Sequence, residues 1–138
     1  MPRAVLDTNV LVSAWLSPHG APAQILVSWR EWAFELVVSP LLMAELAGVL
    51  QLPKVARRAT RDDTDAFLLD LWLNAVVALD PKHVPTAVDL DPADDFIVAL
   101  ARTARASVIV SGDRHLLRLQ DLDPPVISPR AFLDRCEF

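Results

Sequence analysis

The chain has 138 residues, enough for one domain but short for two. Its 53% hydrophobic and 22% charged content is typical of a globular protein, and no apolar run approaches the roughly 20 residues of a membrane span. By simple counting, the formal net charge of −5 argues against a nucleic-acid binder. Cys136 is the single cysteine, which excludes an internal disulfide, and no signal-peptide pattern is visible. We therefore expect a cytoplasmic location.

Strand and helix patterns alternate along the chain. Short apolar runs predict strands at residues 3–6, 34–38, 76–79, 107–111 and 126–127. Helical periodicity and start signals predict helices at 9–16, 22–32, 39–51, 60–75, 91–104 and 128–136. No repeat or linker divides the chain, so we expect one domain over residues 1–138. This alternation indicates an α/β fold with a mainly parallel sheet, helices on both faces, and functional groups at the carboxyl ends of the strands.

Acids follow two of the predicted strands. The apolar residues 4–6 end at Asp7, after which helical periodicity begins. Such an acid either starts the helix, as Asp commonly does, or delivers a carboxylate to a site at the sheet edge. Asp113 repeats the arrangement behind the apolar residues 108–110 and a short turn. The recurrence favours a carboxylate site at the sheet edge over helix initiation alone.

Glu45 is the only charged residue between positions 36 and 53. Its helix is apolar on nearly every side, so we expect the carboxylate to be buried. An uncompensated carboxylate there would cost several kcal/mol. The side chain starts about 8 Å along the helix and leans back toward the strand ends. We favour a metal-linked role over an ion pair with an Arg from another helix.

A third group of acids opens the helix predicted at 91–104. Asp91 fits helix initiation without further function. Asp94 shares a face with apolar residues that should contact the sheet, whereas Asp95 lies nearer the boundary between that face and the solvent-facing side. We therefore expect Asp94 to be the better residue for a buried site, with Asp95 as second choice.

Four acids can thus meet at one edge: Asp7, Glu45, Asp94 and Asp113. Carboxylates that close raise one another's pKa unless a divalent cation lies among them. An all-oxygen set without a Cys or His pattern indicates Mg²⁺ or Mn²⁺. Such a site can activate water or hold a phosphodiester.

The motifs together resemble the PIN domain family, and within it the VapC-type ribonucleases of toxin–antitoxin pairs. In chain order they are Asp7-Thr8-Asn9, Ser39-Pro40 with Glu45, Asp91-Pro92-x-Asp94-Asp95, and Ser111-Gly112-Asp113 followed by Leu116-Leu117. Each motif is short, but their order and spacing together are specific. The resemblance covers essentially the whole chain.

This resemblance implies a three-layer α/β/α sandwich and a Mg²⁺- or Mn²⁺-dependent endoribonuclease site held by the same four acids. It also implies that Asn9 orients Asp7 by hydrogen bonding and that Ser111 supports a metal-bound water. Activated water would attack the phosphorus and leave a 5′-phosphate and a 3′-hydroxyl. Family members usually dimerise and are often silenced by a cognate antitoxin, so we expect both partners. His115 stands where many members carry another acid, which leaves a fifth acidic ligand open.

A basic cluster follows the helix that carries Glu45. It consists of Lys54, Arg57, Arg58 and Arg61. It is either a solvated loop or, beside a nuclease site, a surface for RNA phosphates.

Two other functions compete with a ribonuclease. An inactive PIN-fold binding or scaffold protein would be marked by the loss of one or more of the four acids, and all four are present. A metal-dependent phosphatase of the haloacid-dehalogenase type would need a second acid two residues after Asp7, where this chain has Asn9.

Overall fold

The computed structural model of the chain describes residues 1–82 and 92–136. Within them, five parallel strands form one sheet in the order β3-β2-β1-β4-β5. The strands are β1 (Arg3–Leu6), β2 (Glu35–Val38), β3 (Val76–Val77), β4 (Val108–Val110) and β5 (Val126–Ile127). Central strand β1 pairs with β2 and β4, and its last three residues are completely buried.

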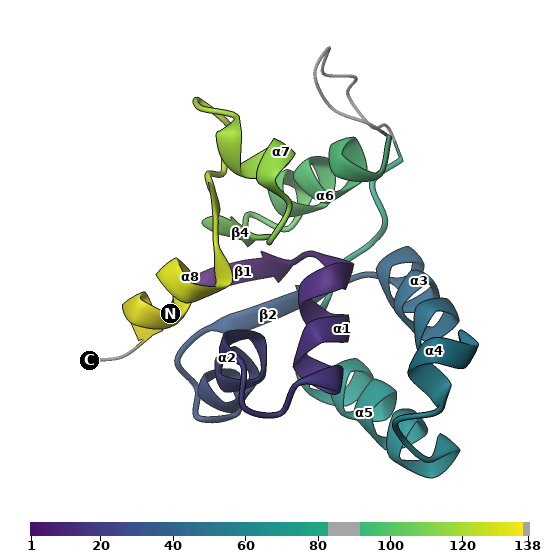
Figure 1. The fold of residues 1–138 in the computed structure, drawn as a ribbon. Coiled ribbons are helices and arrows are strands. Elements are labelled where there is room, and N and C mark those ends of the chain that lie inside the picture. The colour runs from purple at the N-terminus through teal and green to yellow at the C-terminus, as the bar shows by residue number, and fades with distance from the viewer. Residues whose placement is uncertain (83–91, 137–138) are drawn as a thin grey trace.

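Helices cover both faces of the sheet (Figure 1). One face carries α1 (Thr8–Leu16), α2 (Ala21–Arg30), α3 (Pro40–Leu50), α4 (Pro53–Ala56), α5 (Arg61–Asn74) and α8 (Pro129–Cys136). The other carries α6 (Pro92–Thr103) and α7 (Arg114–Arg118). Right-handed crossovers explain the division, because the chain moves from β1 through β2 to β3 and then reverses direction to reach β4 and β5. The predicted three-layer α/β/α sandwich is confirmed.

Side-chain caps start two of the long helices where the sequence predicts them. Ser39 accepts a 3.2 Å hydrogen bond from the N–H of Leu42, with Pro40 in the first turn of α3. Thr60 accepts a 3.1 Å bond from the N–H of Asp63 at the start of α5. Both hydroxyls satisfy N–H groups that have no partner within the helix.

Several element boundaries differ from the prediction. The helix α2 stops at Arg30 because Trp32 has a left-handed backbone with φ of 67°, which ends a helix. Residues 53–56 form the short helix α4 rather than loop, with Pro53 in its first turn. The strand β3 has two residues instead of four. The predicted helix start at Asp91 lies outside the described residues.

The hydrophobic core holds the helices against the sheet. Phe34, directly before β2, packs edge-on against Phe132 of α8 with ring centroids 4.9 Å apart. Trp15 of α1 stacks on Phe67 of α5 at the same separation. Each fully buried large apolar side chain stabilises the folded state by about 1.5–3 kcal/mol relative to an exposed one. This packing holds Asp7, the residue that follows β1, in a fixed position.

Among the described residues, no helix is both long and apolar enough to cross a membrane.

Candidate active site

Asp7 lies directly after the central strand. Its N–H donates a 2.9 Å hydrogen bond to the carbonyl of Val110, which extends the pairing of β1 with β4 by one residue. Asp7 then occupies the N-cap position of α1, but its side chain makes no capping hydrogen bond. The carboxylate is therefore available at the carboxyl edge of the sheet.

Ser111 links the two acids that follow strands. Its buried hydroxyl donates a 3.0 Å hydrogen bond to Asp7 Oδ2 and accepts a 3.0 Å bond from the N–H of Asp113. Asp113 in turn accepts a 2.8 Å bond from the N–H of His115 and so caps α7. One serine thus fixes the β1 end and the β4 end relative to each other and connects the Asp7 side chain to the backbone of Asp113.

The pKa of Asp7 is raised above its ordinary value of 3.8. Burial is the main cause, because it penalises the charged form. The hydrogen bond from Ser111 opposes the shift, as do the backbone N–H groups of Thr8 and Asn9, while the charge of Asp113 adds to it. The charge of the Asp7 carboxylate is therefore incompletely compensated, and a bound cation would compensate it.

Asn9 contributes to this environment through its backbone. Its N–H favours the charged form of Asp7 without making a regular capping bond. The Asn9 side chain is exposed. The expected role of that side chain in orienting Asp7 stays a prediction.

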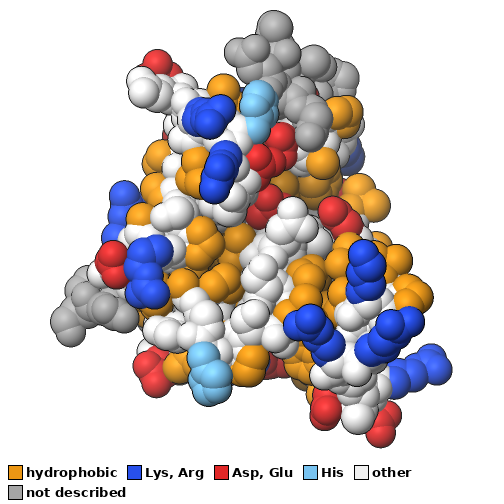
Figure 2. All heavy atoms as spheres, in the orientation of Figure 1, with side chains coloured by type: hydrophobic (Ala, Val, Ile, Leu, Met, Phe, Trp, Pro, Cys, Tyr) orange, Lys and Arg blue, Asp and Glu red, His pale blue; other side chains and the backbone are white. Residues whose placement is uncertain are grey.

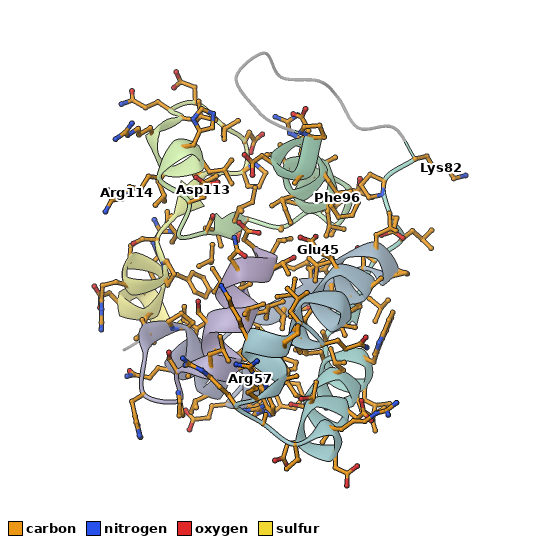
Figure 3. The ribbon with its side chains drawn as sticks, turned by 45° about the vertical axis from the view of Figure 1, so that its right-hand side comes forward. Glu45, Arg57, Lys82, Phe96, Asp113 and Arg114 are labelled. Carbon is orange, nitrogen blue, oxygen red and sulfur yellow. The ribbon has the colours of Figure 1, made fainter. Side chains whose placement is uncertain are left out.

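Glu45 is exposed, which corrects the expectation of a buried carboxylate. The helix α3 buries only one side, and its outer residue Leu41 is 57% exposed. The energetic argument from burial of an uncompensated charge therefore does not apply. In Figure 3, Glu45 projects from α3 on the side that faces α6. The buried side of the helix consists of Leu42, Met43, Leu46 and Leu50.

Asp94 and Asp95 lie in the first turn of α6 and are both buried, at 7% and 6% exposure. The expectation that Asp95 lies nearer the boundary is therefore wrong. The helix α6 contacts β1 and β4 together, so a broader part of its surface is covered than one apolar line. The positive end of the helix dipole favours carboxylates in this turn.

The donor chemistry fits an oxygen-preferring divalent cation. Asp7 and Asp113 carry carboxylate oxygens, which are the hard donors that such cations prefer. Thr8 is 3% exposed, and its hydroxyl makes no hydrogen bond with the described residues, so a further oxygen beside Asp7 lacks a partner. Sequence reasoning gave Thr8 no role, although it lies inside the first motif.

Among the described residues, the four predicted acids do not form a complete ligand group. Within residues 1–82 and 92–136, no three Asp, Glu, His or Cys side chains lie close enough together to hold a metal ion. The structure joins Asp7 to Asp113 but shows no such cluster with Glu45 and Asp94. The convergence of all four acids stays a prediction.

The basic cluster lies on the surface at α4. Its members Lys54, Arg57, Arg58 and Arg61 are exposed, and none forms a salt bridge with a described residue. Figure 2 shows basic side chains over α4 and over α7, with acidic side chains between the two groups. Arg57, labelled in Figure 3, belongs to the α4 group. The cluster therefore shares one face of the molecule with acidic side chains.

A hollow of about 440 Å³ lies at the opposite end of the sheet. Trp29, Trp32 and Phe34 line it, together with Arg30 and Asp70. Those two charged groups already form a 2.8 Å salt bridge. Because this hollow lies at the start of β2, it is separate from the carboxyl edge that carries Asp7.

The fold and the acid-lined sheet edge define the class of protein. A PIN domain family model matches residues 3–115, and the chain belongs to the PIN domain family. PIN domains are generally nucleases that act on phosphodiester bonds.

Individual relatives extend this comparison. The chain is 27% identical to the uncharacterized protein MJ1680 of Methanocaldococcus jannaschii over 119 residues, which is 86% of this chain and 76% of that protein. The crystal structure of PAE2754 from Pyrobaculum aerophilum is similar, with a TM-score of 0.63 and 16% identity over 99% of this chain and 89% of that one. VapBC2 from Rickettsia felis, bound to a DNA fragment from their promoter, gives a TM-score of 0.57 and 14% identity over 91% and 98%. The two solved structures show a shared fold.

Proposed function

We propose that this protein is a Mg²⁺- or Mn²⁺-dependent endoribonuclease that cleaves single-stranded RNA. The observation that carries the proposal is the pair Asp7 and Asp113, joined through Ser111 at the carboxyl edge of a parallel sheet. A raised pKa at Asp7 is typical of functional carboxylates and supports the same conclusion. Membership of a nuclease family supplies the reaction class.

The acids have distinct roles in this proposal. Asp7 and Asp113 would hold the cation, with Asp94 and Glu45 completing the ligand set. A bound divalent cation supplies water activation and neutralisation of phosphate charge. Ser111 keeps the Asp7 carboxylate oriented by its 3.0 Å hydrogen bond. Asp95 supports the site from the first turn of α6.

An RNA cleavage assay tests the proposal. Purified wild-type protein is incubated with labelled single-stranded RNA and Mg²⁺ or Mn²⁺, beside Asp7→Ala and Glu45→Ala. We expect cleavage by the wild type, loss of about 100-fold or more on removal of Asp7, and loss of activity on chelation with EDTA. Equal cleavage by all three proteins would identify a contaminating nuclease and refute the site.

The same assay separates the competing functions. A binding or scaffold protein would retain RNA without cutting it under any metal condition. A phosphatase would release phosphate from p-nitrophenyl phosphate and leave internal phosphodiesters intact. The presence of Asn9 rather than an acid disfavours the phosphatase.

We further propose that the protein acts in the cytoplasm as the toxin of a toxin–antitoxin pair. The similarity in fold to VapBC2 supports this role. A small reading frame next to the gene would encode the antitoxin. Expression of this chain alone should arrest growth, and co-expression of the neighbour should relieve the arrest. Growth unaffected by active nuclease would indicate a housekeeping enzyme.

A second copy of the chain is the proposed partner for the outer side of α5. Leu69, Trp72 and Leu73 are 55%, 41% and 71% exposed, and their spacing places them on one side of the helix. Val77 of the edge strand β3 continues this apolar surface at 46% exposure. A helix with apolar residues on both sides needs a packing partner on each side. Homodimerisation would bury the outer side of α5.

A further inference from the structure

We propose that Arg114 and Arg118 of α7 form a second anchor for the RNA backbone, on the far side of the acids from the α4 cluster. Nothing in the family comparison assigns these two residues. The inference rests on the proposed ribonuclease function and makes it more specific. It requires one RNA strand to cross the edge of the sheet between two basic surfaces.

The position of α7 is coupled to the candidate active site. Asp113 caps the helix by accepting the His115 N–H at 2.8 Å, and its own N–H donates to Ser111. Because Ser111 also holds Asp7, a single hydrogen-bonded chain connects the start of α7 to the first carboxylate. Side chains on α7 therefore occupy fixed positions relative to the acids.

Arg114 and Arg118 are suited to bind phosphate. They are four residues apart on α7, so their side chains start about 6 Å from each other on one side of the helix. Both are exposed, and neither forms a salt bridge with a described residue. The opposite side of α7 is anchored by Leu116, which is completely buried. Guanidinium groups of this kind bind phosphate oxygens in a fork geometry.

The second basic surface lies across the acids. Figure 2 shows the basic side chains over α7 and those over α4 on one face, separated by acidic side chains. In Figure 3, Arg114 lies beside Asp113 in the upper part of the view and Arg57 lies below Glu45 in the lower part. A polyanion bound to both groups would pass near these acidic side chains, and a divalent cation there would reverse their repulsion of phosphate. The arrangement explains how a chain of net charge −5 can bind RNA.

Direct binding measurements test the second anchor. Fluorescein-labelled single-stranded RNA is titrated at several salt concentrations with Ca²⁺ in place of Mg²⁺ or Mn²⁺, so that a cation is present for the acids, and gel analysis verifies that the RNA stays intact. The variants are Arg114→Gln/Arg118→Gln, Lys54→Gln/Arg57→Gln, and both pairs combined. The matched control is Arg105→Gln/Arg135→Gln. These two exposed arginines follow α6 and end α8, at the end of the sheet away from Asp7.

Loss of two phosphate contacts should reduce the slope of log K against log salt by about 1.4, from about 0.7 per contact on single strands. We expect this reduction for the α7 pair and the α4 pair separately, and their sum in the combined variant. The control should keep the wild-type slope. As the oligonucleotide is shortened, the salt slopes of the variants should converge on one another once the RNA no longer reaches both basic surfaces. In cleavage assays, the α7 pair should raise KM and leave kcat within about twofold.

The second anchor and the proposed function fail in different ways. If the α7 variant keeps the wild-type salt slope, as the control should, the anchor is refuted even when the wild type cleaves RNA. If the wild type binds RNA with the expected α7 dependence but never cleaves it with Mg²⁺ or Mn²⁺, the nuclease function is refuted and the anchor stands. Circular dichroism melting verifies that each variant is folded.

Discussion

Ser111 donates a 3.0 Å hydrogen bond to Asp7, a residue 104 positions earlier in the chain. The bond joins the ends of two adjacent parallel strands at the edge that carries Asp7 and Asp113. Ser111 is completely buried, so its hydroxyl cannot exchange this partner for bulk water. Ser111 therefore orients the Asp7 carboxylate together with the backbone N–H groups of Thr8 and Asn9.

Replacing Ser111 with Ala should lower nuclease activity by about 10–100-fold, the usual effect of removing a group that orients a metal ligand. The hydrogen bond favours the charged form of Asp7, so its loss should raise the pKa of Asp7 further. The acidic limb of the pH–rate profile should move to higher pH. The control is Ser107→Ala, which removes a 3.1 Å bond to the Arg3 carbonyl at the other end of the sheet. An unshifted profile in Ser111→Ala would contradict the orienting role.

Asp7→Asn should stabilise the metal-free protein at neutral pH. The pKa of Asp7 is raised in the folded state, so folding carries a penalty when the group is ionised in both states. The penalty is complete above the folded-state pKa and disappears below 3.8, where both states are protonated. The stability difference from wild type should therefore shrink as pH falls from 7 toward 3.8 in thermal unfolding. The control Asp134→Asn changes an exposed acid of α8, and a pH-independent difference for Asp7→Asn would count against the linkage.

Removal of the Asp80 carboxylate should weaken the start of α3. Both of its oxygens accept from the N–H of Leu41, at 3.1 and 3.3 Å. Asp80→Ala should reduce the free energy of unfolding by about 0.5–2 kcal/mol, the usual cost of a lost helix cap. Asp80→Asn, which keeps an acceptor, should lose less. Urea denaturation measures both, and equal stability of Asp80→Ala and wild type would show that Ser39 caps the helix alone.

The two sides of α3 should respond differently to truncation. Leu46→Ala removes a completely buried side chain and should cost about 2–5 kcal/mol. Leu41→Ala removes a side chain that is 57% exposed and should change stability by about 0.5 kcal/mol or less. Urea denaturation of both variants checks the orientation of α3 that leaves Glu45 at the surface. Similar losses in the two variants would contradict that orientation.

Leu73→Asp should disrupt the proposed homodimer. Leu73 is 71% exposed on the outer side of α5, so a charge there leaves the isolated chain folded but cannot be buried in an apolar interface. Light scattering after size exclusion should show a dimer for wild type and a monomer for the variant. Val27→Asp, at a 50% exposed position on α2, provides the control and should remain dimeric. A dimeric Leu73→Asp would place the interface elsewhere.

The fold, and the positions of Asp7 and Asp113 after their strands, could be predicted because their signals are local. A short apolar run followed by an acid marks both strand ends: Asp7 comes directly after β1, and Asp113 comes after β4 and a two-residue turn. Ser39 and Thr60 mark their helix starts by hydroxyl groups that bond within three residues. Alternation of strands and helices, together with the right-handed crossover, then predicts a parallel three-layer fold.

The tertiary structure alone decided which acids are buried. The exposure of Glu45 and the burial of Asp95 depend on how far neighbouring elements cover α3 and α6. A helix's own sequence does not contain that information. The bond between Ser111 and Asp7 likewise exists only because β1 and β4 are adjacent in the sheet. The sequence by itself determined the fold class and a set of acids, while packing between distant segments decided how those acids are held.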